Sequence, residues 1–278
     1  MIVVGERINA TRKSIREAIR SRDRETIQRE IIIQDRAGAH FIDLNAGTGS
    51  GEINQEADDL RWLIDVALES TDKNLTLDTA DPAVMRRAAK HVAGRRPWLL
   101  NSVKGSALVM EPLLVLAVEH DAPIVALAMN AMGIPGDSDQ RIAICEKIFE
   151  EARHVGIPEK NLFFDPLVLP LSADISQGRV TLETLRGIKE RFPRSKTTLG
   201  LSNISYGLPQ RSKINRSFVI AAISHGLDAA ICDPTNSELR QSILLGELIA
   251  GRDRHCRRFT RAARKGEFEK GERKPHEQ

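Results

Sequence analysis

The stretch Phe41-Ile42-Asp43-Leu44-Asn45-Ala46-Gly47 shows the unit from which this chain is built. Its apolar residues predict a short buried strand over 41–44, and Asp43 and Asn45 place a carboxylate and an amide at the carboxyl end of that strand. A helical pattern over 56–68 comes next, with apolar residues recurring at intervals of three and four. We therefore interpret this part of the chain as one β-strand and the α-helix after it.

The same alternation of short aliphatic runs and longer amphipathic stretches recurs along the chain and is typical of repeated βα units. About eight units fit without a gap, which predicts one closed (β/α)8 TIM barrel of the α/β class. An open doubly wound sheet is the alternative, but the first turn, Gly5-Glu6-Arg7-Ile8-Asn9, has no GxGxxG pattern. The strands are predicted at 2–5, 41–44, 75–77, 98–100, 123–128, 162–164, 197–200 and 229–231.

Composition agrees with one folded domain. The chain has 278 residues, of which 41% are hydrophobic and 28% charged, so a large core can be buried. We place the barrel domain at 1–258 and interpret 259–278 as a basic, partly disordered C-terminal tail. The net charge is only +3, aromatic residues make up 4%, and no nucleic-acid-binding motif accompanies the tail. We therefore expect no nucleic-acid partner.

Cysteine use and hydropathy indicate a reduced, cytoplasmic protein. The three cysteines, Cys145, Cys232 and Cys256, are widely spaced and form no CxxC pair, which argues against a disulfide framework and against a zinc site. The first residues read as a strand rather than as a signal peptide. No apolar run approaches the roughly 20 residues that a bilayer span needs, so we expect no membrane association.

A polar residue lies at or just after the end of each predicted strand. In a closed barrel these ends converge on one mouth, where barrel enzymes carry their sites. Asp and Asn are also favoured as caps and turn formers, so each position alone has a structural explanation. Together they suit a flat heterocycle rich in hydrogen-bond donors, such as the 2-amino-4-oxo pyrimidine edge of a pterin. The set is Glu6, Asp43, Asn45, Asp78, Asn101, Asn130, Asp165, Asn203 and Asp233.

Other chemistries have no support in these positions. No strand ends in a lysine placed for a Schiff base, and no GxSxG elbow occurs. No cluster of His, Asp and Glu has metal-ligand spacing, so no bound metal is predicted. The residues alone thus predict a barrel enzyme but do not identify its substrate.

Seven motifs follow one another along the chain. They are Gly5-Glu6-Arg7-Ile8-Asn9, Asp43-Leu44-Asn45-Ala46-Gly47, Leu77-Asp78-Thr79, Asn101-Ser102, Met129-Asn130-Ala131-Met132-Gly133-Ile134-Pro135, Asp165-Pro166-Leu167-Val168-Leu169-Pro170 and Gly200-Leu201-Ser202-Asn203-Ile204-Ser205. In this order they resemble the methyltetrahydrofolate:corrinoid methyltransferases of the pterin-binding barrel superfamily. That superfamily also includes dihydropteroate synthase and the folate domain of cobalamin-dependent methionine synthase.

The resemblance extends up to about Arg258 and is closest to the stand-alone members that serve demethylation systems. It implies that Asp78, Asn101 and Asp165 hold the pterin ring, and that Asn203 lies against N5 as the catalytic residue. Four further positions match neighbouring family positions and are expected to help bind the pterin: Asp43, Asn45, Asn130 and Arg211.

The resemblance also implies the partners. Tetrahydrofolate or its methyl form is the expected substrate, and a partner protein is expected to carry the corrinoid (cobalamin). The nearest match to a corrinoid-binding motif is Asp253-Arg254-His255-Cys256-Arg257-Arg258, which has Arg where that motif has Gly. A homodimer is implied by the family alone. The implied activity is transfer of the N5 methyl group between tetrahydrofolate and the corrinoid, and the subgroup resembled implies the direction from methylcorrinoid to tetrahydrofolate in a demethylation pathway. The sequence itself does not fix the direction, the primary methyl donor or the identity of the corrinoid protein.

Two alternatives stay open. A different pterin-binding enzyme, such as a dihydropteroate synthase, would open with an Asn-x-Thr-Pro-Asp-Ser-Phe loop and carry a late Ser-x-Arg-x-His element, and neither occurs here. A non-catalytic folate-binding component of a methyl-transfer complex would keep Asp78, Asn101 and Asp165 but would not need Asn203.

Overall fold

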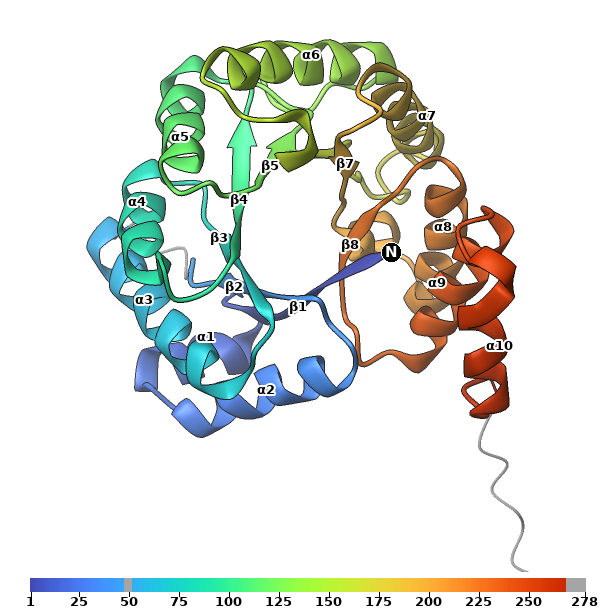
Figure 1. The fold of residues 1–278 in the computed structure, drawn as a ribbon, viewed down its shortest axis with the longest axis horizontal. Coiled ribbons are helices and arrows are strands. Elements are labelled where there is room, and N and C mark those ends of the chain that lie inside the picture. The colour runs from blue at the N-terminus through green and yellow to red at the C-terminus, as the bar shows by residue number, and fades with distance from the viewer. Residues whose placement is uncertain (48–51, 269–278) are drawn as a thin grey trace, which may run out of the picture.

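The computed structural model describes residues 1–47 and 52–268 and shows eight parallel strands that form a nearly closed barrel with helices around it (Figure 1). The predicted (β/α)8 barrel is therefore confirmed. Neighbouring strands are hydrogen-bonded in the order β7-β6-β5-β4-β3-β2-β1-β8. The strands are β1 (Ile2–Asn9), β2 (Phe41–Asn45), β3 (Asn74–Asp78), β4 (Trp98–Lys104), β5 (Ile124–Leu127), β6 (Leu162–Asp165), β7 (Lys196–Thr197) and β8 (Ala229–Cys232).

The helices form an outer ring around this sheet (Figure 1). They are α1 (Lys13–Ser21), α2 (Arg24–Arg36), α3 (Ile53–Ser70), α4 (Pro82–Val92), α5 (Ala107–Glu119), α6 (Ser138–His154), α7 (Gln177–Arg191), α8 (Arg211–Ser224), α9 (Ser237–Ile249) and α10 (Arg257–Arg264). Three short 3₁₀ turns lie in the connections between these elements: η1 (Glu159–Asn161), η2 (Leu201–Ser205) and η3 (Arg254–Cys256). In the described part of the chain, no helix is both long and apolar enough to cross a bilayer.

The interior of the barrel changes from apolar to polar along the strands. Leu99, Val125, Phe163 and Ala229 pack together as a buried cluster inside the barrel. Alternate residues of a strand face the same side, so the row that begins with Leu99 continues with Asn101, and the row of Phe163 continues with Asp165. The amino-terminal end of the barrel is therefore filled, and the carboxyl end presents polar groups.

The barrel closes between β7 and β8, where the strand is shorter than predicted, whereas β1 and β4 run beyond the predicted 2–5 and 98–100 to Asn9 and Lys104. The predicted strand 197–200 is shortened to a two-residue β7, because its later residues pair only singly with β8. The Ile231 amide donates to the Leu199 carbonyl at 2.9 Å, and Gly200 forms a single parallel bridge with Ile231. Backbone pairing alone is therefore sparse at this closure.

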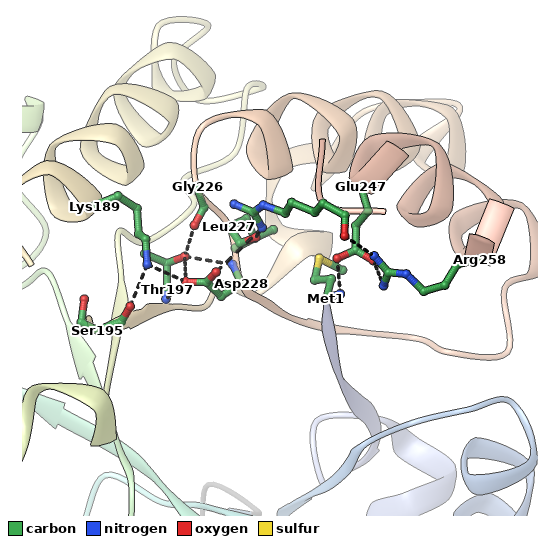
Figure 2. A network of polar contacts seen from close by, with 10 residues as sticks. Met1, Lys189, Ser195, Thr197, Gly226, Leu227, Asp228, Glu247 and Arg258 are labelled. Carbon is green, nitrogen blue, oxygen red and sulfur yellow. Dashed lines mark hydrogen bonds and ion pairs between the residues drawn. The ribbon is translucent and has the colours of Figure 1, made fainter. Parts of the chain in front are cut away.

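Side chains reinforce the closure (Figure 2). The carboxylate of Asp228, just before β8, accepts hydrogen bonds from the Thr197 amide and from Lys189 Nζ, both at 3.1 Å. Lys189 also donates to the Ser195 carbonyl at 2.7 Å, and the Thr197 hydroxyl donates to the Gly226 carbonyl at 2.7 Å. One carboxylate thus joins α7, β7 and the start of β8.

The expected domain boundary at residue 258 falls inside α10, the helix that packs against α9. The amides of Arg258 and Phe259 both donate to the Asp253 carboxylate, which holds the start of this helix. The last part of the expected tail, 269–278, lies outside the described residues. The division into a barrel domain and a tail stays a prediction.

Replacing Asp228 with Ala should lower the free energy of unfolding by about 1–3 kcal/mol, because Lys189 Nζ and the Thr197 amide lose their shared acceptor. Urea unfolding followed by circular dichroism measures this change. Glu183→Ala is the matched control, since it breaks an exposed pair with Arg179 on α7 and should cost less than about 1 kcal/mol. Equal losses in the two variants would contradict a special role for Asp228.

Candidate active site

Four polar residues lie side by side across β1 to β4, at the carboxyl ends of β1, β2 and β3 and in the middle of β4. The strand register pairs Asn9 with Asn45, Asn45 with Asp78, and Asp78 with Asn101. Asn45 donates from Nδ2 to Asp78 Oδ2 at 2.9 Å, and its own Oδ1 accepts from the Gly47 amide at 3.1 Å. The structure thus brings Asn45, Asp78 and Asn101 together, and burial raises the pKa of Asp78.

Asp43 lies one layer deeper, paired in register with Thr76. Burial, and then repulsion from Asp78, raise the pKa of Asp43 well above its usual range. The neighbouring Asn101 side chain acts to lower the pKa of Asp43. Asp43 Oδ1 and Thr76 Oγ1 are buried and have no hydrogen-bond partner within the described residues. Buried polar atoms seldom stay unpaired, so this end of the barrel is suited to a ligand that brings its own donors.

Asp165 ends β6 on the opposite side of the barrel and is 6% exposed. Its Oδ1 accepts a hydrogen bond from the Leu167 amide at 2.7 Å. Burial raises the pKa of Asp165 to about 7, against the opposing effects of that hydrogen bond and of the Arg141 charge. This carboxyl therefore changes charge in the neutral pH range, in contrast to an ordinary aspartate.

Asn203 lies in the middle of η2 and is exposed, at the mouth side of the barrel. The turn that carries it is fixed by two neighbours. Ser202 donates from Oγ to Glu6 Oε1 at 3.0 Å. Arg211 donates from Nη2 to the Ser202 carbonyl at 2.8 Å and from Nε to Ser205 Oγ at 3.1 Å. Arg211 thus contacts the turn of Asn203, and burial raises the pKa of Glu6 beneath it.

Asn130 has mainly local contacts. Its Oδ1 accepts from the Met132 amide at 2.8 Å, and its backbone forms a bridge with Gly133. It lines a cavity of about 700 Å³ between the loops after β4 and β5, together with Ser106 and Leu108. The residues lining this cavity do not include Asp78, Asn101 or Asp165. Asn130 is the predicted site residue whose contacts are furthest removed from the other polar side chains.

Sequence reasoning missed three residues that organise the mouth. Arg7 on β1 joins α2 to the loop after β8 through Glu30, at 2.8 Å, and Asp233, also at 2.8 Å. Ser202 and Arg141 hold the turns of Asn203 and Asp165. Arg7 and Ser202 occur inside quoted motifs, whereas Arg141 sits in an amphipathic helix and gives no sequence signal. Across residues 1–47 and 52–268, no three His, Cys, Asp or Glu side chains group as metal ligands would.

Comparison with known proteins gives a family match and two related proteins. A family model described as pterin binding enzyme matches residues 5–233. The methylcorrinoid:tetrahydrofolate methyltransferase of Eubacterium limosum is 32% identical over 270 residues, which cover 96% of this chain and 98% of that protein. Methionine synthase of Mycobacterium tuberculosis is 30% identical over 245 residues, or 83% of this chain but only 20% of that protein.

Solved structures of dihydropteroate synthases share the fold. The Yersinia pestis enzyme with a pterine-sulfa conjugate has a TM-score of 0.66 at 19% identity, covering 90% of this chain and 93% of that one. The Coxiella burnetii enzyme with pteroic acid has a TM-score of 0.62 at 16% identity, covering 81% and 86%. These likenesses concern the barrel architecture. By the family match and the full-length relative, the chain belongs to the pterin-binding enzyme family, as a relative of the methylcorrinoid:tetrahydrofolate methyltransferase of Eubacterium limosum.

Proposed function

We propose that this protein is a methyltransferase that moves a methyl group between N5 of tetrahydrofolate and a corrinoid carried on a partner protein. The observation that supports it most is the full-length relation to a methylcorrinoid:tetrahydrofolate methyltransferase. We infer the same direction, from methylcorrinoid to tetrahydrofolate, as part of a demethylation pathway. The homodimer and the cytoplasmic location expected from the sequence stay predictions.

The arrangement of acceptors supports pterin binding. Asp78 and Asp165 end strands on two sides of the barrel, Asn101 pairs in register with Asp78, and all three face the interior. Carboxylates accept paired hydrogen bonds from an amino group and an adjacent ring N–H, which is the pattern along one pterin edge. The unpartnered Asp43 Oδ1 and Thr76 Oγ1 lie at the same end of the barrel and offer further polar contacts.

Asn203 is the residue we propose to contact the reacting atom. The corrinoid supplies the methyl group on cobalt; the C–Co bond breaks with its electron pair left on cobalt, N5 bonds the carbon, and N5 releases its proton. The Asn203 side chain is exposed on a turn that Glu6, through Ser202, and Arg211 hold in place. An amide carbonyl held there accepts a hydrogen bond from the N5 proton and orients the N5 lone pair, which is stabilisation by a positioned dipole.

Two other functions compete with this one. Dihydropteroate synthesis has the support of the shared barrel, but that likeness is below 20% identity and concerns the fold. A non-catalytic folate-binding subunit would not require Asn203. Formation of dihydropteroate from its two precursors would favour the first, and folate binding without methyl transfer would favour the second.

The deciding experiment is an anaerobic, light-protected assay of the purified protein with methylcob(III)alamin and tetrahydrofolate. Growth of the cob(I)alamin absorbance with matching methyltetrahydrofolate is the expected result. If free cobalamin does not react, calorimetric titration with methyltetrahydrofolate follows. Absence of folate binding would overturn the proposal.

Folate affinity should depend on pH through Asp165. Its pKa of about 7 in the ligand-free protein means that the neutral form dominates below that pH, whereas the pterin edge requires the carboxylate. Affinity should be constant well above pH 7 and fall about tenfold per pH unit below it. Calorimetric titration between pH 5.5 and pH 9 measures this range. Asp165→Asn should bind more weakly and lose this dependence; a variant that kept the wild-type profile would assign the titration elsewhere.

Asn203→Ala should slow methyl transfer by about 10²–10³-fold while changing folate affinity little, because the proposed contact matters most as N5 reacts. Single-turnover kinetics and calorimetry separate the two quantities. Ile175→Ala is a control in the loop between β6 and α7, since its side chain is 87% exposed. Turnover of Asn203→Ala within a few-fold of wild type would remove Asn203 from the mechanism.

A further inference from the structure

Arg141 is an arginine on α6 whose side chain is fully buried. Its guanidinium donates only to neutral acceptors: the carbonyls of Pro135 at 2.9 Å, Pro166 at 3.1 Å and Leu167 at 2.9 Å, and Gln177 Oε1 at 2.7 Å. No carboxylate pairs with it among the ion pairs of the described residues. Burying a positive charge of this kind costs folding free energy unless nearby groups stabilise it.

The contacts of Arg141 lead directly to Asp165. Leu167 has a φ of 64°, an unfavourable conformation for a bulky side chain, so its orientation must be held by its surroundings. Its carbonyl accepts from Arg141 and, at 3.0 Å, from Thr181 Oγ1. Its amide then donates to Asp165 Oδ1. Arg141 therefore fixes the residue that holds the site carboxylate.

The charge of Arg141 acts on the same carboxylate. Two charged or titratable groups that interact with Asp165 come from α6. Arg141 favours the carboxylate form of Asp165. The Cys145 thiol stays neutral because burial raises its pKa. From α7, Gln177 contributes a neutral amide to Arg141. Arg141 is thus the cation that opposes the burial of Asp165.

We propose that Arg141 is a positioning residue for pterin binding, which fixes the turn at Leu167 and places a positive charge near Asp165. The inference rests on the proposed function, since it assumes that Asp165 receives the donor edge of the folate. A purely structural arginine would join the loops after β5 and β6 without affecting the charge of Asp165. The two roles differ in the pH dependence of binding.

The test compares methyltetrahydrofolate binding by calorimetry across pH in the wild type, Arg141→Gln and Arg141→Lys. Arg141→Gln keeps a donor but removes the charge, so the pH midpoint of binding should rise by about one unit or more. Affinity near neutral pH should then be about tenfold weaker and recover at high pH. Arg141→Lys loses most carbonyl contacts but keeps the charge, so its midpoint should rise less than that of Arg141→Gln.

Gln177→Met is the matched control, because it removes one hydrogen bond of Arg141 without changing any charge, and its midpoint should not move. Equal midpoints in Arg141→Gln and the wild type would overturn the inference, even if both Arg141 variants bind more weakly. If Arg141→Gln does not fold, a midpoint raised by about one unit or more in the charge-retaining Arg141→Lys would overturn it. If the wild type binds no folate at any pH, the proposed function itself is wrong.

Discussion

Carboxyl groups buried inside a closed barrel are the constraint on which the rest of this structure depends. Asp43, Asp78 and Asp165 lie where eight strands converge, and burial raises the pKa of each. Such groups are tolerated only when neighbours supply hydrogen bonds or opposite charge. Asn45 donates to Asp78, the Leu167 amide donates to Asp165, and Arg141 contributes positive charge. The conformations of the surrounding loops follow from these contacts.

The apolar half of the barrel makes this polar half possible. Leu99, Val125, Phe163 and Ala229 fill the interior below the carboxylates, so the strands are held together from within. Backbone pairing is sparse at the closure between β7 and β8. Side-chain hydrogen bonds of Asp228 and Lys189 add to the few backbone bonds there. The contacts of Asp228 lie at the amino-terminal end of β8, so their loss and the loss of the site can be separated experimentally.

The sequence predicted the eight strands because each is a short apolar run between longer amphipathic stretches, and the parallel arrangement followed from that alternation. It also predicted that Asn45, Asp78 and Asn101 would lie together, since strand ends converge in a barrel. The end of the seventh strand was predicted too long, because three residues after Thr197 make only isolated contacts with β8. Arg141 could not be predicted: on a helix its charge reads as solvent-exposed, and its burial depends on loops distant in sequence.

The unpartnered atoms of Asp43 and Thr76 have a consequence for the lifetime of the protein. Within the described residues these two buried atoms have no hydrogen-bond partner, and atoms of this kind lower the stability of a fold unless a ligand or water satisfies them. A ligand that satisfies them binds only the folded state, so by mass action it raises the fraction of chains that stay folded. Persistence in the cell, where unfolded chains are degraded, is thereby linked to substrate supply. An enzyme built in this way would be retained when its substrate is abundant and removed faster when it is scarce.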